Sequence, residues 1–252
     1  MENWLVAGFW GLVSGLALVL GSLIGYYGKI SQRTVAIIMG FGAGVLMSAL
    51  SFELMDEAFE TGGFRSTAIG FISGAVIYSA ANYLLSTKGA RHRKRSEGQQ
   101  PSEAEQSGSG LAIALGALLD GIPEAIAIGI SMIQGGVVSI ATVAAIFISN
   151  IPEGLSSSTG MKNAGRSKLF IFGIWTAIAI LTSIAAILGY TVFADLSPAV
   201  NAATIAIAAG AILTMLADTM IPEAFEKGHN LIGMVTAIGF LCAFMLSKVA
   251  VA

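Results

Sequence analysis

Eight apolar runs, each about as long as a bilayer-spanning helix, follow one another along the chain. They cover residues 4–27, 34–57, 66–86, 110–132, 136–160, 168–193, 199–224 and 230–251. Only helices and closed barrels satisfy all their backbone polar groups inside hydrocarbon, and runs of roughly 20 residues suit helices. The sequence therefore predicts an all-α membrane protein with eight transmembrane helices, organised as a single transmembrane domain over residues 1–252.

The composition excludes several classes of protein. Charged residues make up only 11% of the chain, against about 25% in soluble domains. A net charge of −2 gives no reason to expect a nucleic-acid partner. Because the nucleotide-binding pattern GxxxxGK[ST] is missing from the sequence, we expect no ATP hydrolysis. Because no basic stretch precedes the first apolar run, we expect this run to be a transmembrane span rather than a cleavable signal peptide.

The distribution of Lys and Arg predicts the orientation in the bilayer. With the N-terminus outside, 11 of the 13 basic residues fall in cytoplasmic connections, and only Arg65 and Lys248 fall outside. We therefore expect a multi-pass protein of the cytoplasmic membrane with both termini extracytoplasmic. Residues 87–109 are polar and aperiodic and predict a disordered cytoplasmic loop. Its Arg-His-Arg-Lys-Arg run suits contact with anionic headgroups of the lipid bilayer.

Two short sequences recur in the outer thirds of the chain. Glu-Ala-Phe-Glu at 57–60 returns at 223–226, and Thr-Ala-Ile-Gly-Phe at 67–71 returns at 236–240. Spans one to three thus resemble spans six to eight. Since three is odd, the two copies cross the bilayer in opposite directions, and the predicted arrangement is 3+2+3 with an inverted repeat. Inverted repeats are typical of transporters, whose substrate sites lie near the midplane.

Spans four and five each carry a carboxylate and a proline in matching positions. Charged side chains inside the hydrocarbon core of a bilayer are costly in free energy, and they usually face the interior of the helix bundle. Residues three or four apart share one helix face, so each motif presents its oxygen atoms together. Such a cage suits a divalent cation, although each residue alone could equally belong to a kink or a helix–helix bridge. The candidate ligands are Asp120, Glu124, Ser149, Asn150 and Glu153.

A second group of acids lies at the ends of two other spans. Glu53, Asp56 and Glu57 end span two on the outside of the predicted topology, and Asp218 and Glu223 end span seven on the inside. Acids in such places concentrate cations electrostatically. We expect them to form the entrance and the exit of a metal pathway.

The segments DGIPEA (120–125) and SNIPEG (149–154) resemble the paired metal motifs in spans four and five of the ZIP family of divalent metal transporters. The resemblance covers nearly the whole chain and implies a prokaryotic member that takes up Zn²⁺, Fe²⁺ or Mn²⁺ as transported substrate, with no cofactor and no enzyme activity. Glu124 and Glu153 match the shared carboxylates. Asp120 and Ser149 stand where relatives usually have histidine or glutamine, and Gly121 replaces an asparagine. A site without imidazole should favour Mn²⁺ and Fe²⁺ more than a histidine-containing one does.

Two other functions remain open from the sequence. One is an intramembrane aspartyl protease that uses Asp120 and Asp218, although this leaves the duplicated Pro-Glu motif unexplained. The other is a proton-coupled carrier of an organic cation. The sequence also leaves open the preferred metal, one or two bound ions, the coupling ion, channel or carrier behaviour, and a homodimer.

Overall fold

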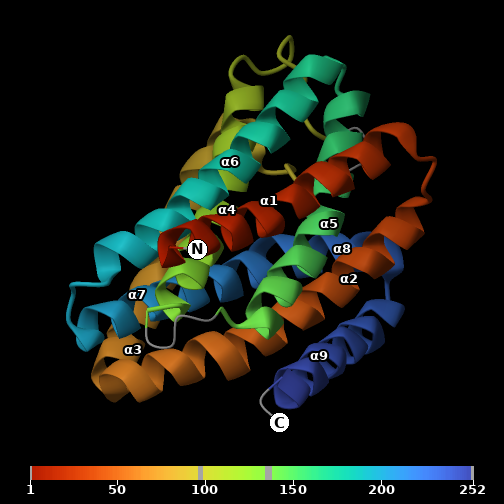
Figure 1. Cartoon of the computed structure of the whole chain (residues 1–252). Helices are drawn as coiled ribbons and strands as arrows, with labels where there is room; N and C mark the ends of the chain where they lie inside the picture. Colours follow the sequence, from red (N-terminus) through yellow and green to blue (C-terminus); the bar gives the residue numbers. More distant parts are fainter. Residues whose placement is uncertain (1, 96–98, 134–137, 251–252) are drawn as a thin grey trace.

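The structure, a computed structural model, describes residues 2–95, 99–133 and 138–250, and within these ranges it is helical with no strand (Figure 1). The long elements are α1 (Asn3–Tyr27), α2 (Gln32–Ala49), α3 (Met55–Leu85), α4 (Ser109–Ser131), α5 (Ile140–Asn163), α6 (Lys168–Phe193), α7 (Pro198–Met215), α8 (Ile221–Gly228) and α9 (Leu231–Ala250). Three π-helical turns continue them: η1 (Leu50–Leu54) between α2 and α3, η2 (Ser86–Ala90) after α3, and η3 (Leu216–Met220) between α7 and α8.

Seven helical segments in the described part of the chain are long and apolar enough to cross a membrane. The prediction of an all-α membrane protein is confirmed. The seven segments differ from the eight predicted spans because α2, η1, α3 and η2 form one helical stretch, Gln32–Ala90, that contains both 34–57 and 66–86. The expected connection between them is helical apart from Gly63, whose φ of 69° and ψ of 178° break the helix. Glycine adopts this backbone conformation without the steric cost of a Cβ.

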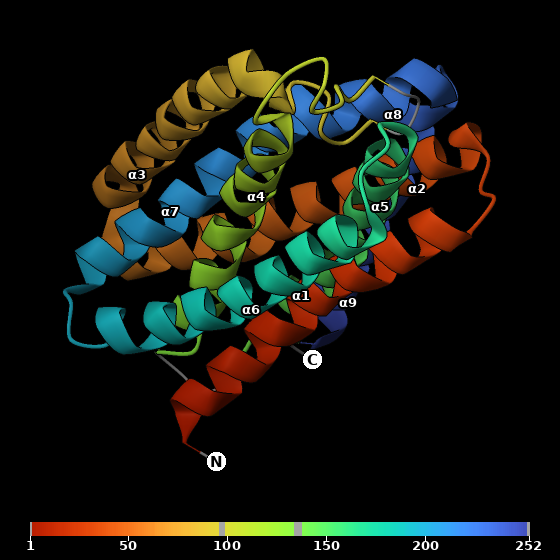
Figure 2. The same ribbon diagram turned by 90° about the horizontal axis from the view of Figure 1, so that it is seen from above.

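The α4 and α5 helices lie in the middle of the bundle (Figure 2). On one side α1 packs on α5 and α6 packs on α4, and on the other α2 packs on α5 and α7 packs on α4. The α3 and α9 helices are peripheral: α3 packs mainly on α7, and α9 mainly on α2. Motifs carried by α4 and α5 are therefore surrounded by helices.

Small residues allow α1 and α5 to approach closely. A Cβ atom added at Gly154 would overlap the carbonyl oxygen of Leu18. At this separation the Asn150 Nδ2 atom on α5 donates to the Ser14 carbonyl oxygen on α1 at 3.1 Å. Close backbone contact through small residues, supported by interhelical hydrogen bonds, is a common way for membrane helices to associate.

Serine caps fix where three of the helices begin. Ser31, Ser139 and Ser167 precede α2, α5 and α6, and each hydroxyl accepts a hydrogen bond from the backbone N–H three residues on. A serine in this position satisfies one of the donors that a helix N-terminus leaves unpaired. Because Ser139 fixes where α5 begins, it helps to fix which face of that helix carries the motif at 149–153.

The segment expected to be a disordered loop, 87–109, folds back over the ends of α4, α5 and α8 in its described parts (Figure 2). Its far end is held by Arg166, whose Nη2 atom donates to Ser109 Oγ at 2.6 Å. Arg93 and Lys94, which we expected at lipid headgroups, are instead buried inside the protein.

Candidate metal site

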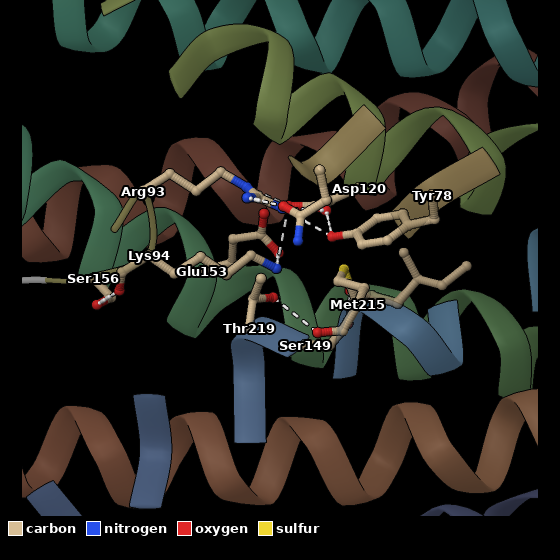
Figure 3. Close-up of polar contacts among 11 residues, drawn as sticks. Tyr78, Arg93, Lys94, Asp120, Ser149, Glu153, Ser156, Met215 and Thr219 are labelled. Atoms are coloured by element: carbon tan, nitrogen blue, oxygen red, sulfur yellow. Dashed lines mark hydrogen bonds and ion pairs between the residues drawn. The ribbon is translucent and has the colours of Figure 1, made fainter. Parts of the chain in front are cut away.

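Asp120, on α4, lies at the centre of a buried polar cluster (Figure 3). The Tyr78 hydroxyl donates to its Oδ1 atom at 2.6 Å. Arg93 donates to both oxygens, from Nη2 to Oδ1 at 3.1 Å and from Nε to Oδ2 at 3.2 Å. The Lys94 ammonium lies 3.2 Å from Oδ2. The carboxylate is thus shared between two cationic side chains from the 87–109 segment and a tyrosine of α3.

Glu153, on α5, faces the same ammonium group. Its Oε2 atom accepts a hydrogen bond from Lys94 Nζ at 3.0 Å. Lys94 therefore bridges the two central helices, with Asp120 on one side and Glu153 on the other. Figure 3 shows the Arg93 and Lys94 side chains reaching between these acids.

The other three predicted ligands are also buried, and none of the five exposes more than 5% of its surface. Glu124 lies one turn after Asp120 on α4. The Ser149 hydroxyl donates to the Ile146 carbonyl oxygen of its own helix at 2.9 Å. Asn150 donates through Nδ2 to α1, so in this conformation it serves as a helix–helix bridge.

Among the described residues, no three His, Cys, Asp or Glu side chains gather closely enough to hold a metal ion. The structure brings Asp120 and Glu153 to a common cation, and it does not bring three acids to a common point. The physical reason is that two cationic groups, from Arg93 and Lys94, stand between the helices that carry these acids.

The three predicted entrance acids differ in what they contact. Glu53, in η1, accepts a hydrogen bond at Oε2 from the cap residue Ser139 at 2.8 Å, and its Oε1 accepts one from Ser247 of α9. Glu57 is half-buried. Asp56 is exposed and lines a cavity of about 400 Å³ with aromatic side chains of α3. Of these three acids, Glu53 is the one tied to a central helix.

The predicted exit acids differ from one another. Asp218 is exposed on η3. Glu223, at the start of α8, has a side chain only 8% exposed, and its Oε1 atom lies 3.9 Å from Arg95 Nε. Arg95 also pairs with Glu226, Nη1 to Oε2, at 2.7 Å. Glu223, Glu226 and Arg95 line a cavity of about 30 Å³ together with Lys94.

The acids around both inserted cations favour the charged form of each. Burial alone would lower the pKa of Lys94, but the carboxylates of Asp120 and Glu153 outweigh it, and the pKa is raised. The pKa of Arg93 is likewise raised, since the attraction of Asp120 exceeds the effect of burial. An opposite charge within about 4–6 Å favours the ionised form. The contacts of Arg93 and Lys94 with these acids have the geometry of ion pairs, at 3.0–3.2 Å.

Sequence reasoning missed the cationic half of this site. Tyr78, Arg93, Lys94 and Gln100 were not among the candidates. One signal pointed to the two cations: the runs of spans four and five contain three carboxylates and no Lys or Arg, and the densest basic run of the chain, residues 91–95, lies just before them in the 87–109 segment. Buried carboxylates need a counter-charge, so a basic run this close is a natural source.

Comparisons with known proteins give relatives that match along most of the chain. In an alignment 259 positions long, the chain is 24% identical to "Zinc transporter ZupT" of Clostridium perfringens (strain 13 / Type A). The alignment covers 91% of this chain and 90% of the relative. The chain is 30% identical over 231 residues to proteins of the same name from Salmonella heidelberg (strain SL476) and Salmonella newport (strain SL254), covering 87% of this chain and 86% of each relative. No family model matches the chain. These relatives are named as transporters, and they give no support to a protease or an organic-cation carrier.

Proposed function

Because the chain belongs to the ZIP family of divalent metal transporters, we propose that it carries Zn²⁺, Fe²⁺ or Mn²⁺ inward across the cytoplasmic membrane through a site at Asp120, Glu124 and Glu153. The relatives are named zinc transporters, which keeps Zn²⁺ among the candidates, while a ligand set made of oxygen atoms favours Mn²⁺ and Fe²⁺. One observation carries the proposal: carboxylates from the two central helices converge on a single cationic nitrogen, at 3.2 Å and 3.0 Å.

The chemistry of this position suits a divalent ion. Asp120 and Glu153 are buried and already bind a cation, and Glu124 lies one turn away on the same helix. Hard divalent ions prefer carboxylate and carbonyl oxygens, which these two helices supply. We further propose that Ser149 and Asn150 turn from their helix contacts to the ion when it binds.

We propose that the eight predicted spans in a 3+2+3 inverted repeat describe the fold. Adding 166 to the bounds of α2 and η1 gives the bounds of α7 and η3. The helix packing shows the same correspondence between the two repeats. The α2 helix packs on α9 as α7 packs on α3, and α1 packs on α5 as α6 packs on α4. The break at Gly63 would divide Gln32–Ala90 into spans two and three, because a straight helix of 59 residues would be roughly three times longer than the hydrocarbon core is thick.

The two groups of pathway acids support an entrance and an exit. Glu53 binds Ser139 at the start of α5, while Glu223 shares a cavity with Ser156, three residues beyond Glu153 on the same helix. The groups therefore lie toward opposite ends of α5, with Glu153 between them. We propose that metal enters past Glu53, Asp56 and Glu57 from outside, where both termini lie, and leaves past Asp218 and Glu223.

Metal uptake into proteoliposomes tests the proposed function. We expect Glu124→Gln and Glu153→Gln each to lower the initial rate of Zn²⁺ or Mn²⁺ uptake by roughly tenfold or more, because each removes a charged ligand. The exposed Glu60→Gln is the matched control and should transport normally. Wild-type rates in both buried variants would overturn the proposed site.

A further inference from the structure

The Arg93–Lys94 dipeptide lies where the transported ion is proposed to bind. The Lys94 ammonium is 3.2 Å from Asp120 and 3.0 Å from Glu153, and the Arg93 guanidinium holds both oxygens of Asp120 (Figure 3). The side chains of Lys94 and Arg93 are only 1% and 2% exposed. Lys and Arg are almost never this buried unless they are paired.

A second set of contacts holds the backbone of this dipeptide in place. The Ser156 hydroxyl on α5 donates to the Lys94 carbonyl oxygen. Gln100 Nε2 is shared by three carbonyl oxygens, those of Arg93 at 2.9 Å, Arg95 at 3.0 Å and Ser157 at 3.1 Å. These bonds involve none of the proposed metal ligands. The segment is therefore docked by groups of its own as well as by the acids.

The charges of the two occupants match. Arg93 and Lys94 together bring two positive charges to the site, and one divalent ion brings two. Replacing the dipeptide by the ion leaves the net charge of the buried site unchanged, whatever the protonation of Glu124. Adding the ion without releasing the dipeptide would place two more positive charges in a site of low dielectric, where like charges repel strongly.

We propose that Arg93 and Lys94 are internal counter-ions of the metal site, and that a divalent ion binds by displacing them in a two-for-two exchange of charge. This inference rests on the proposed metal site at Asp120 and Glu153. In the metal-free protein the dipeptide neutralises acids that would otherwise be buried without partners. In the metal-bound protein the dipeptide is released from α5. The strength of docking then sets the apparent metal affinity, since the apparent dissociation constant is the intrinsic one divided by the fraction of undocked protein.

Metal-binding calorimetry with Mn²⁺ on purified full-length protein tests the exchange. We expect Lys94→Gln to lower the apparent dissociation constant at least tenfold, because the ion then competes with one cation instead of two. Arg91→Gln is the matched control on the same segment, since Arg91 is exposed, and it should bind as wild type does. An unchanged or higher dissociation constant in Lys94→Gln would overturn the inference.

A second variant keeps every charge and so guards against misfolding of the first. Gln100→Ala removes three hydrogen bonds of the docked backbone, and we expect Mn²⁺ binding to tighten here too, by a smaller factor. Unchanged Mn²⁺ affinity in a folded Gln100→Ala protein would count against the exchange.

The release itself is measured by thiol labelling. Ser156→Cys, in a Cys242→Ser background, places a thiol under the docked dipeptide, because Ser156 is only 2% exposed. Saturating Mn²⁺ should raise the rate of modification by a charged thiol reagent several-fold. An equal rate with and without Mn²⁺ would overturn the displacement.

Glu153→Gln separates failure of this inference from failure of the proposed function. If Glu153→Gln binds Mn²⁺ as tightly as wild type, the proposed metal site is wrong and the inference falls with it. If Glu153→Gln loses binding while Lys94→Gln and the labelling rate are unchanged, the metal site stands and the counter-ion role is wrong.

Discussion

Replacing Tyr78 by Phe removes one oxygen atom from the buried cluster and should destabilise the metal-free protein measurably. The hydroxyl donates to Asp120 Oδ1 at 2.6 Å and accepts from Arg93 Nη2 at 2.8 Å. Both partners are charged, and Tyr78 itself is only 1% exposed, so water cannot readily replace the lost bonds.

The expected size follows from the number and kind of bonds. A hydrogen bond to a charged group contributes about 1.5–3 kcal/mol. Asp120 and Arg93 remain paired with each other at 3.1 Å, so the loss should stay near that range rather than double it. In a chain of this length a loss of 1 kcal/mol lowers the melting temperature by about 2–4 °C, which predicts a fall of roughly 3–12 °C.

Thermal unfolding of the purified protein in detergent, without added metal, is the assay. Tyr83→Phe provides the control, since Tyr83 lies on the same helix with 71% of its surface exposed and loses the same atom. Equal melting temperatures for the two variants would show that the Tyr78 hydroxyl is not engaged with Asp120 and Arg93, and would refute the buried cluster as described.

Three further predictions concern the metal, the packing and the docked segment. In a competition titration Mn²⁺ or Fe²⁺ should bind at least as well as Zn²⁺, because the proposed ligands are all oxygen, and a preference for Zn²⁺ by orders of magnitude would contradict this. Gly44→Ala should destabilise the protein by about 1–3 kcal/mol, since its Cβ would overlap the Thr236 carbonyl oxygen, whereas Gly173→Ala meets no neighbour and should not, as denaturation would show. Hydrogen bonds from Arg166 and then from two backbone N–H groups lower the pKa of Glu103 to about 2, so its contribution to docking should be complete above about pH 4.5 and disappear as the pH falls toward 2. Hydrogen-exchange protection over residues 101–110, taken relative to the intrinsic exchange rate at each pH, should follow that loss, and Glu103→Gln should make this protection independent of pH in this window.

The transmembrane helices were largely predictable because hydrocarbon imposes a minimum length of apolar sequence on each of them. The helices on 3–27, 109–131 and 168–193 begin and end within a residue of the predicted runs. The connection near residues 58–65 was not predictable in this way. Hydropathy indicates which parts of the chain contact lipid. It does not indicate whether the polar residues between two spans are helical, as they are here on both sides of Gly63.

The acidic half of the site was predictable for a related reason. Carboxylates inside apolar runs are rare and costly, so Asp120 and Glu153 are conspicuous in the sequence. The cationic half was not, because the composition of 87–109 indicates a solvated loop and gives no information about distant partners. Arg93 is 27 residues away from Asp120 and Lys94 is 59 residues away from Glu153, and such pairing depends on tertiary structure.

X-ray absorption spectroscopy of the zinc-loaded protein tests the central claim most directly, because it reports the atoms bound to the metal. With Asp120, Glu124 and Glu153 as ligands, the first shell should consist of oxygen at about 2.0–2.2 Å without imidazole scattering, and Glu153→Gln should lose the bound zinc. A sulfur shell at about 2.3 Å, a histidine signature, or full zinc retention in Glu153→Gln would contradict the assignment of these carboxylates as the metal site.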